Sequence, residues 1–115
     1  MGFLKFEGEY FNGKIRKGKV YDRYKDILKF EGEYSNGLRN GKVKIYYNNG
    51  ILKFEGEYLN DKRYGKGKEF DNNNKLIYEG EFKNGKRNGK GKEFYENGEV
   101  KYEGEYLNGE RKNPN

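Results

Sequence analysis

This chain of 115 residues contains no cysteine, histidine, tryptophan, alanine, threonine or glutamine, and Ser35 is its only serine. Without cysteine and histidine, the chain itself cannot form a disulfide, a thiolate or imidazole metal site, or a nucleophile paired with an imidazole base. We therefore predict that it is not an enzyme and has no catalytic residues, no metal site and no cofactor.

Long apolar runs are also missing. No stretch is apolar enough to cross a membrane, and the segment from Met1 to Phe6 lacks the apolar core of a signal peptide. We therefore expect a cytoplasmic protein, with attachment to the periphery of a membrane as an open alternative.

Hydrophobic residues make up only 31% of the chain and charged residues 38%, a balance that by itself would indicate disorder. Aromatic residues and glycine argue for order instead. The chain is 17% aromatic and has 18 glycines, and both types recur at even spacing. The composition therefore indicates an ordered protein that is too poor in aliphatic residues for a conventional packed core.

A five-residue segment recurs with a constant period. It reads FEGEY in three copies, YEGEF in the fourth and YEGEY in the fifth. The copies begin 24 residues apart, at Phe6, Phe30, Phe54, Tyr78 and Tyr102. A fixed period of this size is the signature of a repeat architecture. The sequence thus predicts a single array that spans residues 1–115.

Each repeat reads as strand, turn, strand, turn. Apolar and charged residues alternate in the recurring segment, Asn-Gly or Asn-Asp follows it, and no segment has apolar residues at helical spacing. We predict an all-β protein, an elongated single-layer antiparallel meander of tandem β-hairpins, with a distorted first hairpin. Its nine strands are predicted at residues 3–11, 18–24, 27–35, 42–47, 51–59, 66–71, 76–83, 90–95 and 99–107.

These features resemble the MORN repeat, whose core pattern is close to YEGEW-x-NG-K-x-x-GKG-x-x-x-Y-x-NG. The segment from Tyr78 to Gly91 matches nearly every position, and the resemblance covers about residues 3 to 111. Tyr or Phe replaces the usual Trp here, and the first repeat lacks the standard GKG. The resemblance implies one hairpin per repeat and a scaffold or adaptor role, often at membranes or the cytoskeleton. Some bacterial members of the family are labelled antitoxin- or immunity-like, and phospholipid binding has been proposed for the family.

The period of two residues in a strand places the motif residues on two faces. The two rings and the glycine of each copy share one face, and we predict that rings lie over glycine. The predicted structural residues are Phe6, Gly8, Tyr10, Phe30, Gly32, Tyr34, Phe54, Gly56, Tyr58, Tyr78, Gly80, Phe82, Tyr102, Gly104 and Tyr106. The gaps between their rings are predicted to be filled by Tyr21, Tyr46, Phe70 and Phe94.

The two glutamates of each copy lie on the opposite face. Lysines on the intervening strands are predicted to alternate with them, each pair contributing roughly 0.2–1 kcal/mol. These lysines include Lys42, Lys44, Lys66, Lys68, Lys90 and Lys92. The alternative, a pair of carboxylates acting as acid and base, is disfavoured because every repeat carries the same pair.

A non-catalytic scaffold that binds a protein partner is the function that this architecture favours, with self-association through a sheet edge or face as one form of it. The net charge of +6 keeps anionic phospholipid as an alternative. Nucleic acid is disfavoured because acidic and basic residues are interleaved. An antitoxin- or immunity-like inhibitor is a further alternative. An anion or lipid contact is predicted at Lys83, Lys86, Arg87, Lys90 and Lys92.

Overall fold

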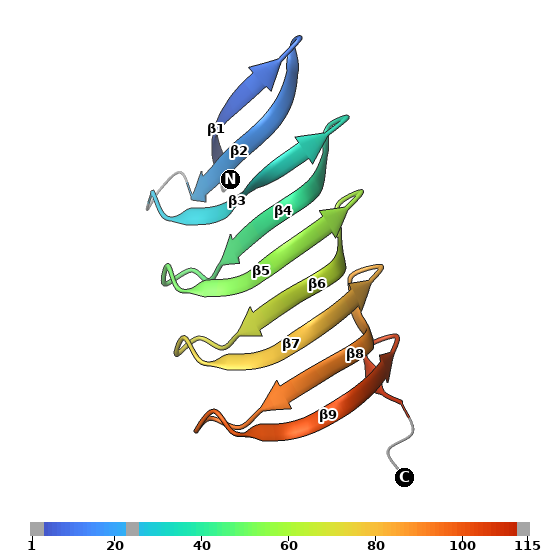
Figure 1. Cartoon of the computed structure of the whole chain (residues 1–115). Coiled ribbons are helices and arrows are strands. Elements are labelled where there is room, and N and C mark those ends of the chain that lie inside the picture. The colour runs from blue at the N-terminus through green and yellow to red at the C-terminus, as the bar shows by residue number, and fades with distance from the viewer. Residues whose placement is uncertain (1–3, 23–25, 113–115) are drawn as a thin grey trace.

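The computed structural model describes residues 4–22 and 26–112, and this part of the chain is one antiparallel sheet without helices (Figure 1). Neighbouring strands in the chain are neighbours in the sheet. The molecule measures 51 × 29 × 22 Å, so it is elongated, as predicted. The ten strands are β1 (Leu4–Phe11), β2 (Lys14–Asp22), β3 (Leu28–Ser35), β4 (Leu38–Tyr46), β5 (Leu52–Leu59), β6 (Lys62–Phe70), β7 (Leu76–Lys83), β8 (Lys86–Phe94), β9 (Val100–Leu107) and β10 (Glu110–Arg111).

The all-β meander of hairpins is confirmed, whereas several strand boundaries were predicted wrongly. The second strand of each hairpin was expected to begin at residues 18, 42, 66 and 90, but it begins at Lys14, Leu38, Lys62 and Lys86. The glycine-containing segments at which these strands are predicted to begin, such as Lys66-Gly67-Lys68, lie inside the strands. The prediction of nine strands also missed the short strand β10. The predicted strand ends at residues 3 and 23–24 lie outside the described residues.

Two-residue turns join the strands of each hairpin. In the turn Asn84-Gly85, for example, φ is 52° for the asparagine and 85° for the glycine. Positive φ at both positions defines the type I′ turn, whose twist matches that of the two strands. In the third repeat Asp61 replaces the glycine at φ 70°, and its carboxylate accepts a hydrogen bond of 2.7 Å from the backbone N–H of Arg39 in the preceding repeat.

A single row of glycines crosses strands β1 to β9, one per strand, with Val43 in place of glycine in β4. The strand register pairs them in the order Gly8, Gly18, Gly32, Val43, Gly56, Gly67, Gly80, Gly91 and Gly104. The aromatic residues of the motif lie on one side of the sheet, here named the ring face. The glutamates and lysines beside the row lie on the other side, the charged face.

The second strands carry a bulge that the sequence did not predict. In β6, the residues Gly65 and Lys66 have no partner in the register of β5, and Gly65 has a φ of 71°. In β2, a single residue, Arg16, is unpaired at the corresponding place. The first hairpin therefore differs from the others by one residue in the bulge, which explains why Lys17-Gly18-Lys19 comes one position earlier in its repeat than Lys66-Gly67-Lys68 does in the third.

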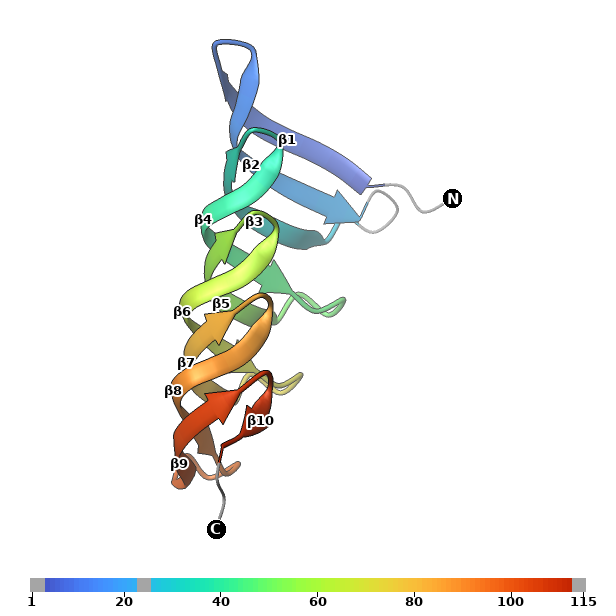
Figure 2. The same ribbon diagram turned by 90° about the vertical axis from the view of Figure 1, so that its right-hand side faces the viewer.

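The core of the protein is one face of one sheet. All the buried apolar side chains of the described residues belong to strands β3 to β9, and no second layer covers them (Figure 2). They are Phe30, Val43, Phe54, Tyr58, Tyr78, Phe82 and Tyr106.

Candidate functional site

The ring face is closed by edge-to-face contacts between aromatic residues. Within a repeat, the first and second rings meet, as Tyr78 and Phe82 do at 5.4 Å between ring centroids. The first ring of one repeat also meets the second ring of the next, as Phe54 does with Phe82 at 5.3 Å and Tyr78 with Tyr106 at 5.2 Å. Edge-to-face geometry is the arrangement that aromatic pairs prefer. With the contact between Phe6 and Tyr34 at 6.0 Å, these contacts join the first repeat to the second and the third, fourth and fifth repeats to one another.

Glycine on the intervening strand makes the contacts between repeats possible. A Cβ atom at Gly67 would lie 2.8 Å from Phe54 Cζ and 3.2 Å from Phe82 Cε1, and one at Gly91 would lie 2.3 Å from the Tyr78 hydroxyl oxygen. Any side chain at these two positions would therefore displace a buried ring. The prediction of rings over glycine is confirmed.

The prediction that Tyr21, Tyr46, Phe70 and Phe94 fill the gaps is wrong. In the described part of the chain, none of these four rings pairs with a motif ring. Tyr46 follows Ile45, which is opposite Phe30 and Phe54, so alternation sends Tyr46 to the charged face, where its hydroxyl donates to Glu31 at 3.2 Å.

Arginine side chains cover the rings instead. The guanidinium carbon of Arg63 lies 4.2 Å from the ring centroid of Phe54, and that of Arg87 lies 4.2 Å from the centroid of Tyr78. Arg39 and Arg111 lie over Phe30 and Tyr102 in the same way. Sequence reasoning missed this role, although these arginines recur with the same period of 24 residues.

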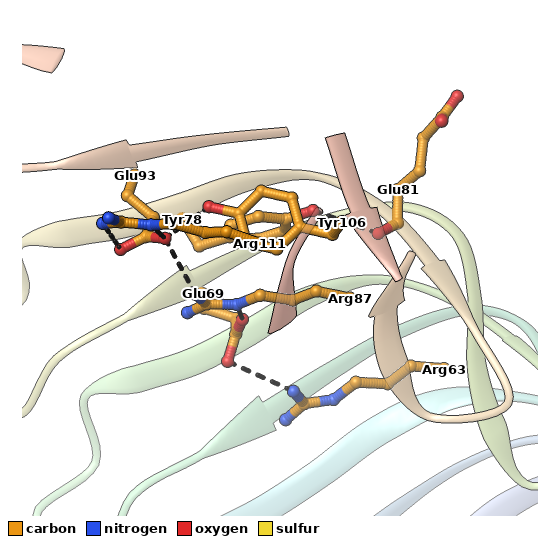
Figure 3. A network of polar contacts seen from close by, with 8 residues as sticks. All are labelled: Arg63, Glu69, Tyr78, Glu81, Arg87, Glu93, Tyr106 and Arg111. Carbon is orange, nitrogen blue, oxygen red and sulfur yellow. Dashed lines mark hydrogen bonds and ion pairs between the residues drawn. The ribbon is translucent and has the colours of Figure 1, made fainter. Parts of the chain in front are cut away.

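Two glutamates link the arginines of the last three repeats into one chain (Figure 3). Glu69 lies 3.3 Å from Arg63 and 2.9 Å from Arg87, and Glu93 lies 3.8 Å from Arg87 and 2.9 Å from Arg111. We name this series the arginine–glutamate chain. Glu69 and Glu93 are only 20% and 17% exposed, so their charges are paired within the fold.

The arginine–glutamate chain and the rings beneath it shift the pKa values of several groups. Hydrogen bonds from Arg111, and then from Tyr106, lower the pKa of Glu93 to about 2 against the opposing effect of burial. Burial raises the pKa of Tyr78 to about 12. Burial, with Glu93 beside the hydroxyl, also raises the pKa of Tyr106. On the ring face, Glu93 therefore stays ionised down to low pH, and the hydroxyls of Tyr78 and Tyr106 stay protonated well above neutral pH.

The charged face has alternating charges along its whole length. Beside the glycine row, glutamates of the odd strands alternate with lysines of the even strands, as predicted. The register of this row is Glu7, Lys19, Glu31, Lys44, Glu55, Lys68, Glu79, Lys92 and Glu103. Each of its four lysines is 3.9–4.0 Å from the glutamate of the following strand.

A second row of charged side chains lies on the other side of the glycine row, and a shallow groove runs between the two rows. In the first three repeats its walls include Glu7, Glu33, Lys44, Glu57 and Lys66. It continues along the glycine row toward β9. Backbone forms the floor of this groove, and both walls carry alternating charge.

The five basic residues predicted to contact an anion or lipid do not form one patch. Lys83 and Lys86 face each other beside the turn that joins β7 to β8. Arg87 lies on the ring face in the arginine–glutamate chain. Lys92 lies on the charged face, 3.9 Å from Glu103, in the row of alternating charge, and Lys90 is opposite Glu105.

Residues 4–22 and 26–112 contain no cluster of three or more acidic side chains that could hold a metal ion. No helix in the same residues is long and apolar enough to cross a bilayer.

Comparison with family models identifies the repeats. The model of the MORN repeat matches residues 78–100 and 102–112, and the model of the MORN repeat variant matches residues 39–60 and 63–84. Comparison with curated proteins found no match. The matched segments cover more than half of the chain and begin after the first hairpin. The MORN repeat defines a non-catalytic repeat family. The matched segments, together with the hairpins laid side by side and the rings over glycine, show that this chain belongs to the MORN-repeat family.

Proposed function

We propose that this protein is a non-catalytic scaffold that binds a protein partner across its charged face. The difference between the two faces carries the proposal. On the ring face, five of the six motif rings of the inner three repeats are buried, Tyr34 being partly buried. Arg63 and Arg87 above them are paired with Glu69 and Glu93. That face is used to hold the repeats together.

The charged face is free to bind. The lysines and glutamates of its four ion pairs have side chains that are 39–65% exposed. Exposed pairs of this kind contribute little to stability, about 0–1 kcal/mol each. A long exposed row of charges at fixed spacing that adds little to stability is well suited to fix the register and choice of a partner.

The alternation of charge favours a protein over a membrane as the partner. Neighbouring strands present opposite signs along the groove, whereas an anionic bilayer would favour a surface of one sign. A polypeptide with its own acidic and basic side chains can match both signs.

The same pair of glutamates occurs in every repeat, so no one pair is set apart for acid–base catalysis.

The test uses two matched pairs of lysines. Lys66 and Lys90 lie on the charged face, and no carboxylate of the described residues is within ion-pair distance of either. Lys62 and Lys86 are the first residues of β6 and β8, beside the two-residue turns and away from the glycine row. The full chain is used to capture binding proteins from the source organism, and the affinity of the purified partner is then measured for both double variants.

We expect Lys66→Ala with Lys90→Ala to weaken binding at least tenfold, and Lys62→Ala with Lys86→Ala to leave it within about twofold. Both variants lose two positive charges, so a general effect of net charge would weaken both equally. Equal weakening, or no weakening of either, would contradict binding through the charged face. Pelleting of the chain with phosphatidylserine vesicles at physiological salt would contradict the choice of protein over lipid.

A further inference from the structure

The two ends of the sheet are finished differently. At the C-terminal end, β10 pairs with β9, and the backbone N–H of Lys112 donates to the carbonyl oxygen of Glu105 at 2.7 Å. The side chain of Lys112 also lies 3.8 Å from the Glu105 carboxylate. At the N-terminal end, β1 is the outermost described strand, and no other described strand pairs with its outer edge. Such an edge is a template for pairing with another chain.

The rings of β1 are also incomplete in their contacts. Phe6 is 36% exposed and Tyr10 is 62% exposed, whereas Phe54 and Tyr106, at equivalent places, are 0% and 3% exposed. In three of the later repeats the second ring packs against the first ring of the repeat before it, as Tyr106 does against Tyr78. Tyr10 is the second ring of the first repeat, and no ring of residues 4–22 or 26–112 packs against it edge-to-face.

The glutamates of β1 differ from those of the later strands in their ion pairs. Lys5 of β1 pairs with Asp26 at 3.0 Å, and Glu7 accepts a hydrogen bond of 3.5 Å from the Tyr21 hydroxyl. Each lysine of the row pairs with the glutamate of the strand that follows it, as Lys19 does with Glu31 at 4.0 Å. Glu7 lies opposite Lys19, yet among the described residues no cationic side chain is within ion-pair distance of it. The lysine that would pair with Glu7 belongs on a strand before β1.

The chain itself shows which strand fits beside a Glu-x-Glu strand. Every even strand from β2 to β8 places two lysines, separated by one residue, opposite the two-glutamate segment. The separating residue is a member of the glycine row, and it is glycine or valine. These segments are Lys17-Gly18-Lys19, Lys42-Val43-Lys44, Lys66-Gly67-Lys68 and Lys90-Gly91-Lys92.

We propose that the outer edge of β1 binds an extended segment of a protein partner with the sequence Lys-Gly-Lys or Lys-Val-Lys, added antiparallel as one more strand. The two lysines meet Glu7 and Glu9 on the charged face, and the small residue between them leaves room for Tyr10 on the ring face. The inference rests on the proposed function in that the partner is a protein, and it adds a place and a recognised sequence.

A second copy of this chain fits the same edge poorly. The even strands of a second copy are paired on both sides within its own sheet. Its edge strands are β1 and the two-residue β10, which covers part of β9. Both β1 and β9 carry the Glu-x-Glu segment, so pairing either with β1 in register would place glutamate against glutamate. The charge of the edge therefore favours another protein.

The experiment uses a fluorescent peptide with the sequence of β8, residues 86–94. The matched control peptide has glutamate in place of the two lysines that correspond to Lys90 and Lys92. The protein variants are Glu7→Lys with Glu9→Lys, and a control of equal charge, Glu96→Lys with Glu99→Lys, at the exposed turn before β9. Far-UV circular dichroism checks that both variants keep their sheet.

We expect the wild-type chain to bind the lysine peptide at least tenfold more tightly than the glutamate peptide. The Glu7→Lys/Glu9→Lys variant should lose or reverse this preference, and the Glu96→Lys/Glu99→Lys variant should keep it. Bound peptide should also slow hydrogen exchange in β1 and not in β9. Equal binding of both peptides, or equal loss in both variants, would overturn the proposal.

The outcome is separable from the test of the charged face. The Lys66→Ala/Lys90→Ala variant keeps Glu7 and Glu9, so it should bind the lysine peptide as the wild-type chain does. Loss of partner binding in that variant with intact peptide binding would support both proposals. Failure of the peptide alone would overturn only the proposal for the edge of β1.

Discussion

The first repeat and the last two carry nearly the same motif, but their rings lie in different surroundings. Phe6 and Tyr10 are 36% and 62% exposed, whereas Tyr78 and Tyr106 are 0% and 3% exposed. The motif therefore does not bury its own rings. Burial depends on the neighbouring repeat and on the residues of the strand between them.

Two positions on the second strands account for much of this difference. Opposite the second ring, the first repeat has Ile15 where later repeats have arginine, as at Arg87. Opposite the first ring of the next repeat, the first two repeats have Val20 and Ile45 where Glu69 and Glu93 follow. The N-terminal half of the ring face is thus aliphatic at its rim, and the C-terminal half is closed by ion pairs.

Removing a ring should give the largest contrast between the two ends. We expect Tyr78→Ala to destabilise the fold by about 3–5 kcal/mol because it leaves a cavity among buried rings, and Phe6→Ala by about 1 kcal/mol because its ring is already partly in water. Urea unfolding followed by far-UV circular dichroism measures both. Similar losses would mean that the first repeat is packed as tightly as the fourth.

Filling the glycine row should give the next largest contrast. A Cβ at Gly91 would meet the buried Tyr78 ring, and one at Gly18 would lie 2.3 Å from Cε1 of the partly exposed Phe6 ring. We expect Gly91→Ala to cost about 2–3 kcal/mol and Gly18→Ala less than about 1 kcal/mol, because Phe6 can move outward. The same unfolding experiment applies. A cost at Gly18 that equals the cost at Gly91 would contradict this account of the rings.

Acid should weaken the C-terminal half first. The pKa of Glu93 is about 2 in the folded chain, below its ordinary value. The ionised carboxylate therefore adds to the free energy of unfolding above about pH 4.5, and this stabilisation is lost as pH falls toward 2. After allowance for solvent screening we expect a loss of about 1–2 kcal/mol. Hydrogen exchange in β8 and β9 at pH 5 and pH 2.5 measures the effect, and Glu93→Gln should remove most of its pH dependence. Equal acid sensitivity in β4 and β5, where Ile45 takes the place of a glutamate, would contradict the assignment.

Breaking one exposed ion pair should have the smallest effect. Lys92 is 46% exposed and lies 3.9 Å from Glu103, so Lys92→Ala should change stability by about 0.5 kcal/mol or less. Unfolding at low and high salt tests this. A loss above about 1.5 kcal/mol would show that the charged face stabilises the sheet, which would weaken the argument that it serves binding.

The repeat motif alone predicted the hairpins, their order and the rings over glycine, because turn chemistry and strand alternation are local properties. It did not predict where the second strands begin, because a glycine such as Gly65 is compatible with both a turn and a bulge. The side of the sheet taken by Tyr46 depends on the register between strands, which the sequence of one strand does not contain. The covering arginines were open to detection, since they share the period of the motif.

The sequence by itself determined a tandem array of hairpins with rings on one face and glutamates on the other, because Asn-Gly turns and a period of two leave few other arrangements. Only the tertiary structure decided which rings are buried, which charges are paired, and that β10 finishes one edge while no described strand pairs with the other. These properties arise between strands, from the register and from the presence or absence of a neighbouring repeat.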